Sequence, residues 1–294
     1  MKVAAVVVTY NRSALLSECI GALLSQSVEL GAVFVVNNNS TDDTSEVLAR
    51  IHDEKLHVID SKTNLGGAGG FCLGIKSAVE QSDCDFVWVM DDDTIPTSTA
   101  LQRLVEFIEH SSRTVGFVCS SVVNAQNQPM NVPIPKNRKN FDSQAGAIEL
   151  QAASFVSIMF NRDAILSLGL PMRKYFIWFD DVEYTHRITA KYQCYLIKAS
   201  RVVHKTVGGN DPDIVTDDAR TPRYFYFYRN KASYYKLHFG FGVGILLYFL
   251  VLVRDSARIL VSANHKTDKL NTLFKGATAG FSFSPKIEYI HQGK

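Results

Sequence analysis

Three consecutive carboxylates, Asp91, Asp92 and Asp93, directly follow the apolar run Phe86–Met90. Side chains alternate along an extended backbone, so Asp91 and Asp93 can point the same way while Asp92 points elsewhere. Two neighbouring carboxylates are hard oxygen ligands suited to Mg²⁺ or Mn²⁺, and such a cation completes its coordination with substrate phosphates. The alternative is a solvated acidic turn in which an aspartate caps the next helix. A motif this short does not decide between the two.

A second acidic group follows an aromatic run, where Tyr175–Phe179 leads into Asp180, Asp181 and Glu183. Apolar neighbours raise the pKa of a carboxyl group, which would make one of these acids a competent base. The alternative is capping of the next helix by Asp180 or Asp181, and both interpretations can hold for different acids. Glu183 and Arg187 have the i,i+4 spacing of a helical ion pair.

The elements that must position these acids begin at the N-terminus. Three β-branched runs predict buried strands of a parallel sheet: Val3–Val8, Ala32–Val36 and Leu56–Ile59. Helices are expected between them, the first capped by Ser13 and the second by a Ser40/Asp43 capping box. This alternation predicts a doubly wound α/β sheet, in which ligands bind at the carboxyl ends of the strands.

A glycine-rich stretch, Asn64–Phe71, opens a helix expected to end at Gln81. Such turns let backbone N–H groups approach phosphates. No G-x-G-x-x-G can be placed on the stretch, and Ile75 stands where a P-loop requires lysine. The alternative is that the glycines permit tight helix–strand packing.

The middle of the chain predicts a helix over 98–110 and strands over 115–119, 150–160 and 193–197. A short helix is expected after 150–160, capped by Asn161 and ended by Gly169. Residues 124–145 carry three prolines and the cluster Lys136/Arg138/Lys139, and could form a flap over a substrate. The basic residues can equally be solvated. His204 is expected in a polar loop after the last strand, where it is either structural or a ligand.

The C-terminal third is aromatic and basic over Arg223–Lys231 and apolar over Gly240–Val253. The apolar run is too short to span a bilayer. Aromatic and basic residues flanking an apolar face suit an interfacial position on anionic lipid, and a core-packed or dimer-forming helix pair is the alternative. We therefore expect two domains, residues 1–220 and 221–294.

The net charge and the cysteine content of the chain favour some classes of protein and argue against others. The chain has 294 residues and a net charge of +2, which argues against a nucleic-acid binder. Five scattered cysteines without C-x-x-C indicate reduced thiols in a cytosolic protein. Met1-Lys2 leads straight into the first strand, so we expect no signal peptide.

Four stretches together resemble the family 2 inverting glycosyltransferases, which have the GT-A fold: Val7–Arg12, Val36–Asp42, Asn64–Phe71 and Asp91–Asp93. Within that family, the glycine stretch and Trp178–Glu183 with a later His204 look most like the bacterial galactofuranosyltransferases. The resemblance spans residues 3–230. It implies a Rossmann-like, mostly parallel central sheet flanked by helices, with a C-terminal helical extension.

The resemblance also implies roles. Asp91, Asp93 and His204 would hold Mn²⁺ or Mg²⁺ against a diphosphate, and Asp181 would be the catalytic base, with Asp180 as the rival because Phe179 is inserted before the acids. The implied substrate-binding residues are Thr9, Asn11, Arg12, Asn37, Asn64, Gly66, Gly67, Asp92, Trp178 and Glu183. Asn37 replaces an aspartate that usually contacts uridine.

The implied activity is transfer of galactofuranose from UDP-galactofuranose to a lipid-linked glycan, with inversion. That step would belong to cell-surface polysaccharide synthesis, such as lipopolysaccharide, at the cytoplasmic face of the bacterial inner membrane. A homo-oligomer is compatible with it. The alternatives are a rhamnosyltransferase using dTDP-rhamnose, a nucleotidyltransferase, and a catalytically silent sugar-nucleotide-binding membrane scaffold.

Overall fold

The computed structural model describes residues 1–137, 146–206 and 212–290. These residues form two compact units. The first contains the described residues of Met1–Arg173, Asp181–Gly208 and Ile287–Lys294, and the second those of Lys174–Asp180 and Gly209–Lys286. The second unit thus includes two segments that the sequence-based division at residue 220 places in the first domain, Lys174–Asp180 and the described part of 209–220, and the described part of Ile287–Lys294 belongs to the first unit.

The first unit is built on a ten-stranded sheet with the order β3-β2-β1-β4-β9-β6-β10-β8-β7, and β5 pairs with β10. The strands are β1 (Val3–Thr9), β2 (Ala32–Asn37), β3 (Leu56–Asp60), β4 (Phe86–Asp91), β5 (Thr94–Pro96), β6 (Val115–Val123), β7 (Ile134–Pro135), β8 (Ala147–Ala152), β9 (Ile158–Asn161) and β10 (Gln193–His204). The first four are mutually parallel, and β6 and β10 run the same way. Strands β9, β8 and β5 run in the opposite direction.

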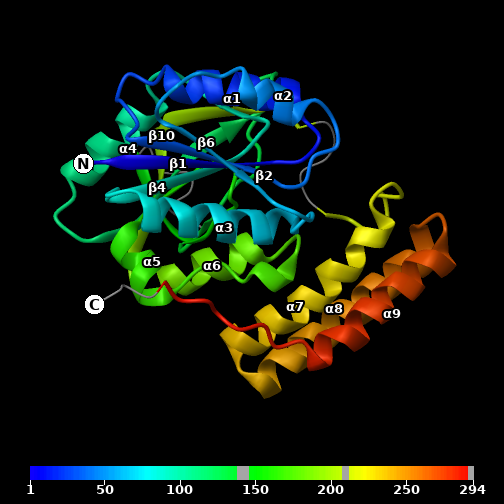
Figure 1. The fold of residues 1–294 in the computed structure, drawn as a ribbon. Coiled ribbons are helices and arrows are strands. Elements are labelled where there is room, and N and C mark those ends of the chain that lie inside the picture. Colours follow the sequence, from blue (N-terminus) through cyan, green and yellow to red (C-terminus); the bar gives the residue numbers. More distant parts are fainter. Residues whose placement is uncertain (138–145, 207–211, 291–294) are drawn as a thin grey trace. The chain divides into compact units, whose positions relative to one another are not determined.

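Helices cover both faces of this sheet (Figure 1). They are α1 (Ser13–Leu24), α2 (Thr44–Ala49), α3 (Gly66–Gln81), α4 (Ala100–Glu109), α5 (Arg162–Leu168) and α6 (Asp180–Thr189). Val3, Ala5 and Val7 pack in one apolar cluster with α1, α2 and α4, while Ala4, Val6 and Val8 pack in another with α3, α5 and α6. Because both faces are covered, β1 is apolar throughout and does not alternate. The predicted α/β fold class is confirmed.

Several local predictions were wrong. Neither Ser13 nor the Ser40/Asp43 pair caps a helix; the N–H of Thr44 donates instead to the side chain of Asp42. The strand predicted over 150–160 is two strands, β8 and β9, with a turn between them. The predicted Asn161 cap and Gly169 terminus are confirmed, since Asn161 Oδ1 accepts from Asp163 N at 2.8 Å and Gly169 has a φ of 77°.

His204 is the last residue of β10, whereas a loop position was predicted. The strand does not stop at Ile197 because it continues beside β6 and then pairs with β5. The predicted flap falls partly outside the described residues, including Arg138 and Lys139. Its described part contains β7, which pairs with β8.

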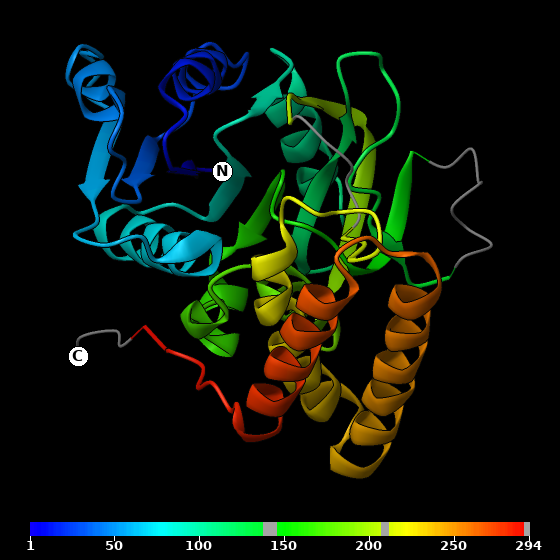
Figure 2. The same cartoon turned by 90° about the vertical axis from the view of Figure 1, so that its right-hand side faces the viewer.

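The second unit is helical, with α7 (Tyr224–Phe239), α8 (Phe241–Ser262) and α9 (Lys266–Ser282) after the 3₁₀ turn η3 (Thr221–Arg223). Helix α7 packs against both α8 and α9, which lie side by side in Figure 2. Buried tyrosines fill the centre, where Tyr248 donates to the carbonyl of Tyr228, and Tyr228 to Asp255. Among the described residues, no helix is both long and apolar enough to cross a membrane.

Candidate active site

The carboxyl ends of four strands meet at one edge of the sheet. The parallel register places Thr9 opposite Asn37, Asn37 opposite Asp60, and Val8 opposite Asp91. The turns that leave these strands therefore bring together polar residues from Thr9 to Asp93 that are far apart in sequence. This is the edge at which α/β sheets bind ligands.

The pairing of β5 with β10 brings His204 to the acidic strand end. His204 lies opposite Thr94 in this antiparallel ladder, and its Nε2 is 3.0 Å from Asp93 Oδ1. Lys205 N also donates to the carbonyl of Asp93 at 2.8 Å. The candidate ligand atoms of Asp91, Asp93 and His204 all lie within 4.8 Å of one another, close enough to hold one metal ion.

The hydrogen bonds around His204 suit a metal ligand. Its Nδ1 lies 2.9 Å from Asn131 Oδ1, an acceptor, so Nδ1 carries the proton. In the neutral ring Nε2 then presents a lone pair to Asp93 Oδ1, which is buried and accepts no well-aligned hydrogen bond. Two lone pairs facing each other require a proton or a cation between them. A metal-bound histidine commonly donates its other ring N–H to an oxygen acceptor, which fixes the orientation of the ring.

Charges in this cluster are partly compensated. Burial and repulsion from Asp93 raise the pKa of Asp91 to about 7. Burial opposes ionisation of Asp93 as well, but the contacts of Asp93 with His204 and Arg12 hold its pKa below the usual range. Burial lowers the pKa of His204, and the stronger sum of its interactions with Asp93 and Asp91 raises it. The site therefore favours ionised Asp93 and attracts positive charge.

Asp92 is held by side chains from the end of β1. Thr9 Oγ1 donates to Asp92 Oδ2 at 2.8 Å, and Arg12 Nη1 lies 3.4 Å from Asp92 Oδ1 and contacts Asp93 as well. Burial raises the pKa of Asp92 to about 6. Asp92 thus ties the end of β1 to the end of β4. About half of the Arg12 side chain, 47%, remains exposed and available to an anion.

The asparagines expected in the nucleotide site shape its loops. Asn11 Oδ1 accepts from Thr41 N at 2.7 Å, which joins the turns after β1 and β2. Asn37 Nδ2 donates to Ser45 Oγ and Asp60 Oδ1 at 3.0 and 2.9 Å, so its amide protons are already bonded. Asn11 and Asn39 have φ values of 55° and 65°, which asparagine tolerates better than most residues.

Asn38, which sequence reasoning missed, links β2 to the glycine-rich turn. Its side chain donates to Gly66 O at 3.1 Å and accepts from Leu65 N at 2.8 Å. Asn64 Oδ1 accepts from Gly66 N at 2.8 Å. The run Asn37-Asn38-Asn39 drew attention to the turn, but no spacing singled out Asn38.

The glycines of α3 divide into two kinds. A Cβ on Gly70 would lie 2.5 Å from Val8 Cγ1, and one on Gly74 would lie 2.4 Å from Val6 Cγ1. These two permit tight helix–strand packing, the alternative left open by the sequence. Gly66 has a φ of 69°, and a Cβ on Gly67 would meet nothing within 4 Å. The start of α3 therefore leaves open space beside the backbone at Gly67.

Among the late acids, Asp181 lies in the first turn of α6. It is half-buried, its Oδ1 accepts from Val182 N at 2.7 Å, and burial raises its pKa to about 6. Glu183 is instead buried in a two-pronged ion pair with Arg187, at 3.1 and 3.0 Å, and Arg187 also donates to the carbonyl of Leu170. That pairing gives Glu183 a structural role in the first unit.

Asp180 and Trp178 belong to the second unit. Asp180 is buried, with 7% of its surface exposed. The Trp178 ring packs against Tyr224, with ring centroids 5.0 Å apart, and against Phe227 at 5.9 Å. Among the predicted site residues, Asp91, Asp93 and His204 form one cluster with Thr9, Arg12 and Asp92, and Asp181 belongs to the same unit.

Comparison with known proteins agrees with this geometry. The model of Glycosyl transferase family 2 matches residues 4–168. Galactofuranosyltransferase GlfT1 of Mycolicibacterium smegmatis is 27% identical over 251 residues, 78% of this chain and 82% of that protein. GlfT1 of Mycobacterium tuberculosis is 30% identical over 197 residues, 63% of each chain.

Solved structures show the same fold at low identity. Staphylococcus aureus TarS superposes with a TM-score of 0.57 and 17% identity, covering 97% of this chain and 44% of TarS. The mannosyltransferase PcManGT from Pyrobaculum calidifontis, in complex with GDP-Man and Mn²⁺, also has a TM-score of 0.57 and 17% identity, covering 96% of this chain and 76% of that one. With its strand-end acids and GT-A fold, the chain belongs to glycosyltransferase family 2 and is a glycosyltransferase.

Proposed function

We propose that this chain is an inverting galactofuranosyltransferase that moves galactofuranose from UDP-galactofuranose to a hydroxyl of a lipid-linked glycan. The observation that carries the donor assignment is the similarity to GlfT1 over 78% of the chain. Two late acids after an aromatic run, expected from the same resemblance, are present at the start of α6. The product would be a β-galactofuranoside of a cell-surface polysaccharide.

We propose that Asp91, Asp93 and His204 bind Mn²⁺ or Mg²⁺. The clustered oxygen and nitrogen donors fit such an ion, and a solved relative of the same fold holds Mn²⁺ with its sugar nucleotide. A bound divalent cation would neutralise the charge that develops on the leaving diphosphate. Arg12, half exposed beside Asp93, supplies a further positive charge at the same strand ends.

Asp181 is the proposed base, and Asp180 the alternative. The Asp181 carboxylate takes the proton of the acceptor hydroxyl as that oxygen bonds to the anomeric carbon. The bond from this carbon to the diphosphate oxygen breaks, and its electron pair leaves with UDP. One displacement inverts the configuration. A pKa raised to about 6 keeps Asp181 largely ionised at neutral pH while making it a stronger base than an exposed aspartate.

We also propose that the second unit contacts an anionic membrane through α8. One stripe of this helix leaves large apolar side chains exposed, up to 80% at Val261. The stripe comprises Val243, Leu246, Phe249, Leu250, Val253, Leu260 and Val261, and Phe241 at the start of the helix is also exposed, at 76%. Arg254 and Arg258 lie beside it. An apolar helical stripe with adjacent basic residues suits the lipid interface, which is where a lipid-linked acceptor would be met.

Donor choice tests the proposed function directly. With Mn²⁺ and a panel of synthetic lipid-linked glycans, we expect turnover of UDP-galactofuranose and a β-linked product by NMR. UDP-glucose and dTDP-rhamnose serve as competing donors. Turnover of dTDP-rhamnose without turnover of UDP-galactofuranose would replace the proposed activity with that of a rhamnosyltransferase.

Metal binding is tested by Asp93→Asn, which keeps the side-chain shape and removes a ligand charge. We expect Mn²⁺ affinity, measured by electron paramagnetic resonance, to fall about 100-fold, since losing even supporting contacts costs 10–100-fold. Asp92→Asn is the matched control and should bind Mn²⁺ nearly as well as the wild type. Equal Mn²⁺ affinity in Asp93→Asn and wild-type protein would contradict the site.

The base is tested by Asp181→Asn. Removing the proton acceptor should lower kcat by about 10²–10⁴-fold, the usual contribution of general base catalysis. UDP affinity, measured by calorimetry, should stay close to that of the wild type. If Asp181→Asn retains full kcat and Asp180→Asn loses it, the roles of the two acids are reversed.

Membrane contact is tested by co-sedimentation with anionic vesicles at low salt. The variant Leu246→Glu/Phe249→Glu should bind at least about tenfold more weakly, because burying each apolar side chain contributes 1.5–3 kcal/mol. Val58→Glu, at an exposed apolar position on β3, is the control and should bind like the wild type. Wild-type protein that stays in the supernatant, or that forms a dimer disrupted by the double variant, would contradict the proposal.

A further inference from the structure

The segment before the late acids has a strained backbone. Phe176, Trp178 and Phe179 have φ values of 66°, 65° and 68°, in the left-handed region that bulky side chains avoid. Each such residue costs about 1–3 kcal/mol and persists only where surrounding contacts hold it. Three of them within four residues therefore require a dedicated support.

Asn230, on α7 of the same unit, supplies hydrogen bonds to this segment. Its side chain is completely buried, and Nδ2 donates to the carbonyls of Tyr175, Ile177 and Trp178 at 2.8, 2.9 and 2.9 Å. One amide group with two N–H bonds thus serves three acceptors within one turn of chain.

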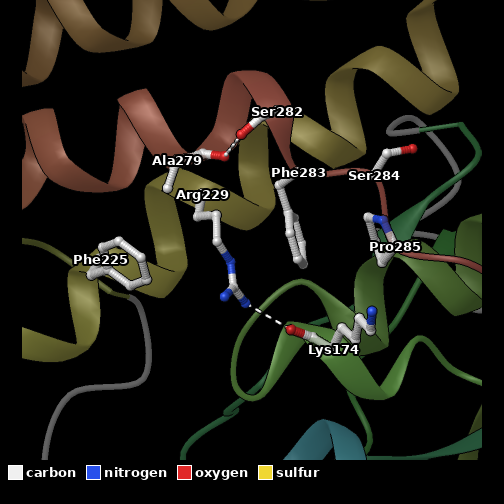
Figure 3. Close-up of a pocket in the computed structure, with 8 residues that line it drawn as sticks. All are labelled: Lys174, Phe225, Arg229, Ala279, Ser282, Phe283, Ser284 and Pro285. Atoms are coloured by element: carbon white, nitrogen blue, oxygen red, sulfur yellow. Dashed lines mark hydrogen bonds between the residues drawn. The ribbon is translucent and has the colours of Figure 1, made fainter.

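Arg229 fixes the orientation of that amide. Its Nε and Nη2 donate to Asn230 Oδ1 at 3.0 and 2.9 Å, which leaves Asn230 Nδ2 directed at the segment. Nη2 also donates to the carbonyls of Lys174 and Tyr175 at 2.8 and 3.1 Å. Figure 3 shows the Arg229 side chain between Phe225 and Phe283, with the guanidinium reaching the Lys174 carbonyl. The Phe283 ring centre lies 4.0 Å from Arg229 Cζ.

Ring contacts hold the side chains of the same segment. Phe176 stacks on Tyr226 with centroids 4.8 Å apart, and Phe179 meets Phe227 at 5.3 Å. Lys231 Nζ lies 4.5 Å from the Phe227 centroid and 5.6 Å from that of Phe179. Helix α7 thus contacts both the backbone and the rings of Lys174–Phe179.

We propose that Arg229 and Asn230 are positioning residues that hold Lys174–Phe179 in its left-handed conformation and so position Asp180, the next residue of the same unit. Asp180 follows this segment directly and belongs to the same unit, so the conformation of the segment sets the direction of the Asp180 carboxylate. The inference rests on the proposed function, which assigns the base to this turn. It gives a role to Arg229-Asn230, which the mechanism otherwise does not use.

The test is Asn230→Asp, which keeps the side-chain size and removes both N–H donors. We expect kcat with the preferred donor to fall about 100-fold, since small misplacements of a reacting group cost this much, while UDP affinity is unchanged. Tyr248→Phe is the matched control, because it removes a buried hydrogen bond to Tyr228 O within the same helical unit. That variant should keep wild-type kcat.

A second readout does not depend on activity. The chain has two tryptophans, and Trp88 is completely buried in the sheet, so acrylamide quenching of fluorescence reports on Trp178. Quenching should rise in Asn230→Asp and stay at the wild-type level in Tyr248→Phe. Arg229→Gln, which leaves Asn230 in place, should give smaller changes in both kcat and quenching.

Wild-type kcat and wild-type quenching in folded Asn230→Asp would overturn the proposal. Thermal unfolding shows whether Asn230→Asp folds. If it does not fold, Arg229→Gln is measured in its place, and wild-type quenching in Arg229→Gln would contradict the proposal. Increased quenching with unchanged kcat would also overturn it, since the segment would then not position the base. The proposed function is tested by other variants. Full activity of both Asp181→Asn and Asp180→Asn would contradict the assignment of the base and would not change the quenching results.

Discussion

The constraint on which the first unit depends is the repulsion among three carboxylates at the end of one buried strand. Three contacts offset it: Thr9 donates to Asp92, Arg12 contacts Asp92 and Asp93, and His204 lies 3.0 Å from Asp93. Thr9 and Arg12 come from the neighbouring strand end, and His204 arrives through the pairing of β5 with β10. The arrangement leaves Asp91 and Asp93 facing a common point, where a cation would complete the compensation.

In the second unit, the unfavourable local state is a left-handed backbone conformation, whereas in the first unit it is repulsion among carboxylates. Three aromatic residues in the left-handed region are costly, and the Arg229-Asn230 pair offsets that cost with hydrogen bonds to carbonyls within Lys174–Trp178. The aromatic rings supply the apolar packing around them. Both regions therefore hold an unfavourable local state through partners that are distant in sequence. Such states are commonly found at functional sites, where they define the position of reacting groups.

Sequence patterns predicted much of this arrangement. Continuous apolar runs identified β1, β2 and β4 because both faces of the sheet are covered, and the strand-end position of Asp91 and Asp93 followed from the same pattern. Helix caps were predicted less well, since the choice between Ser40, Asp42 and Asp43 depends on the exact path of the turn. His204 was assigned to a loop because its strand continues beyond Ile197 only through pairing with β6 and β5, contacts made with residues distant in sequence.

By itself, the sequence determined the apolar periodicity that builds the sheet, the acids at the end of β4, the glycines that start α3 and the family motifs. Only the tertiary structure decided which partners those residues take. It showed that Asn131 contacts the His204 ring and that Asn230 bonds to Tyr175–Trp178, whereas the Glu183–Arg187 ion pair was already predicted from its i,i+4 spacing. The physical reason is that strand and helix periodicity is a local property, whereas a hydrogen bond between distant residues depends on register and packing that no local pattern encodes.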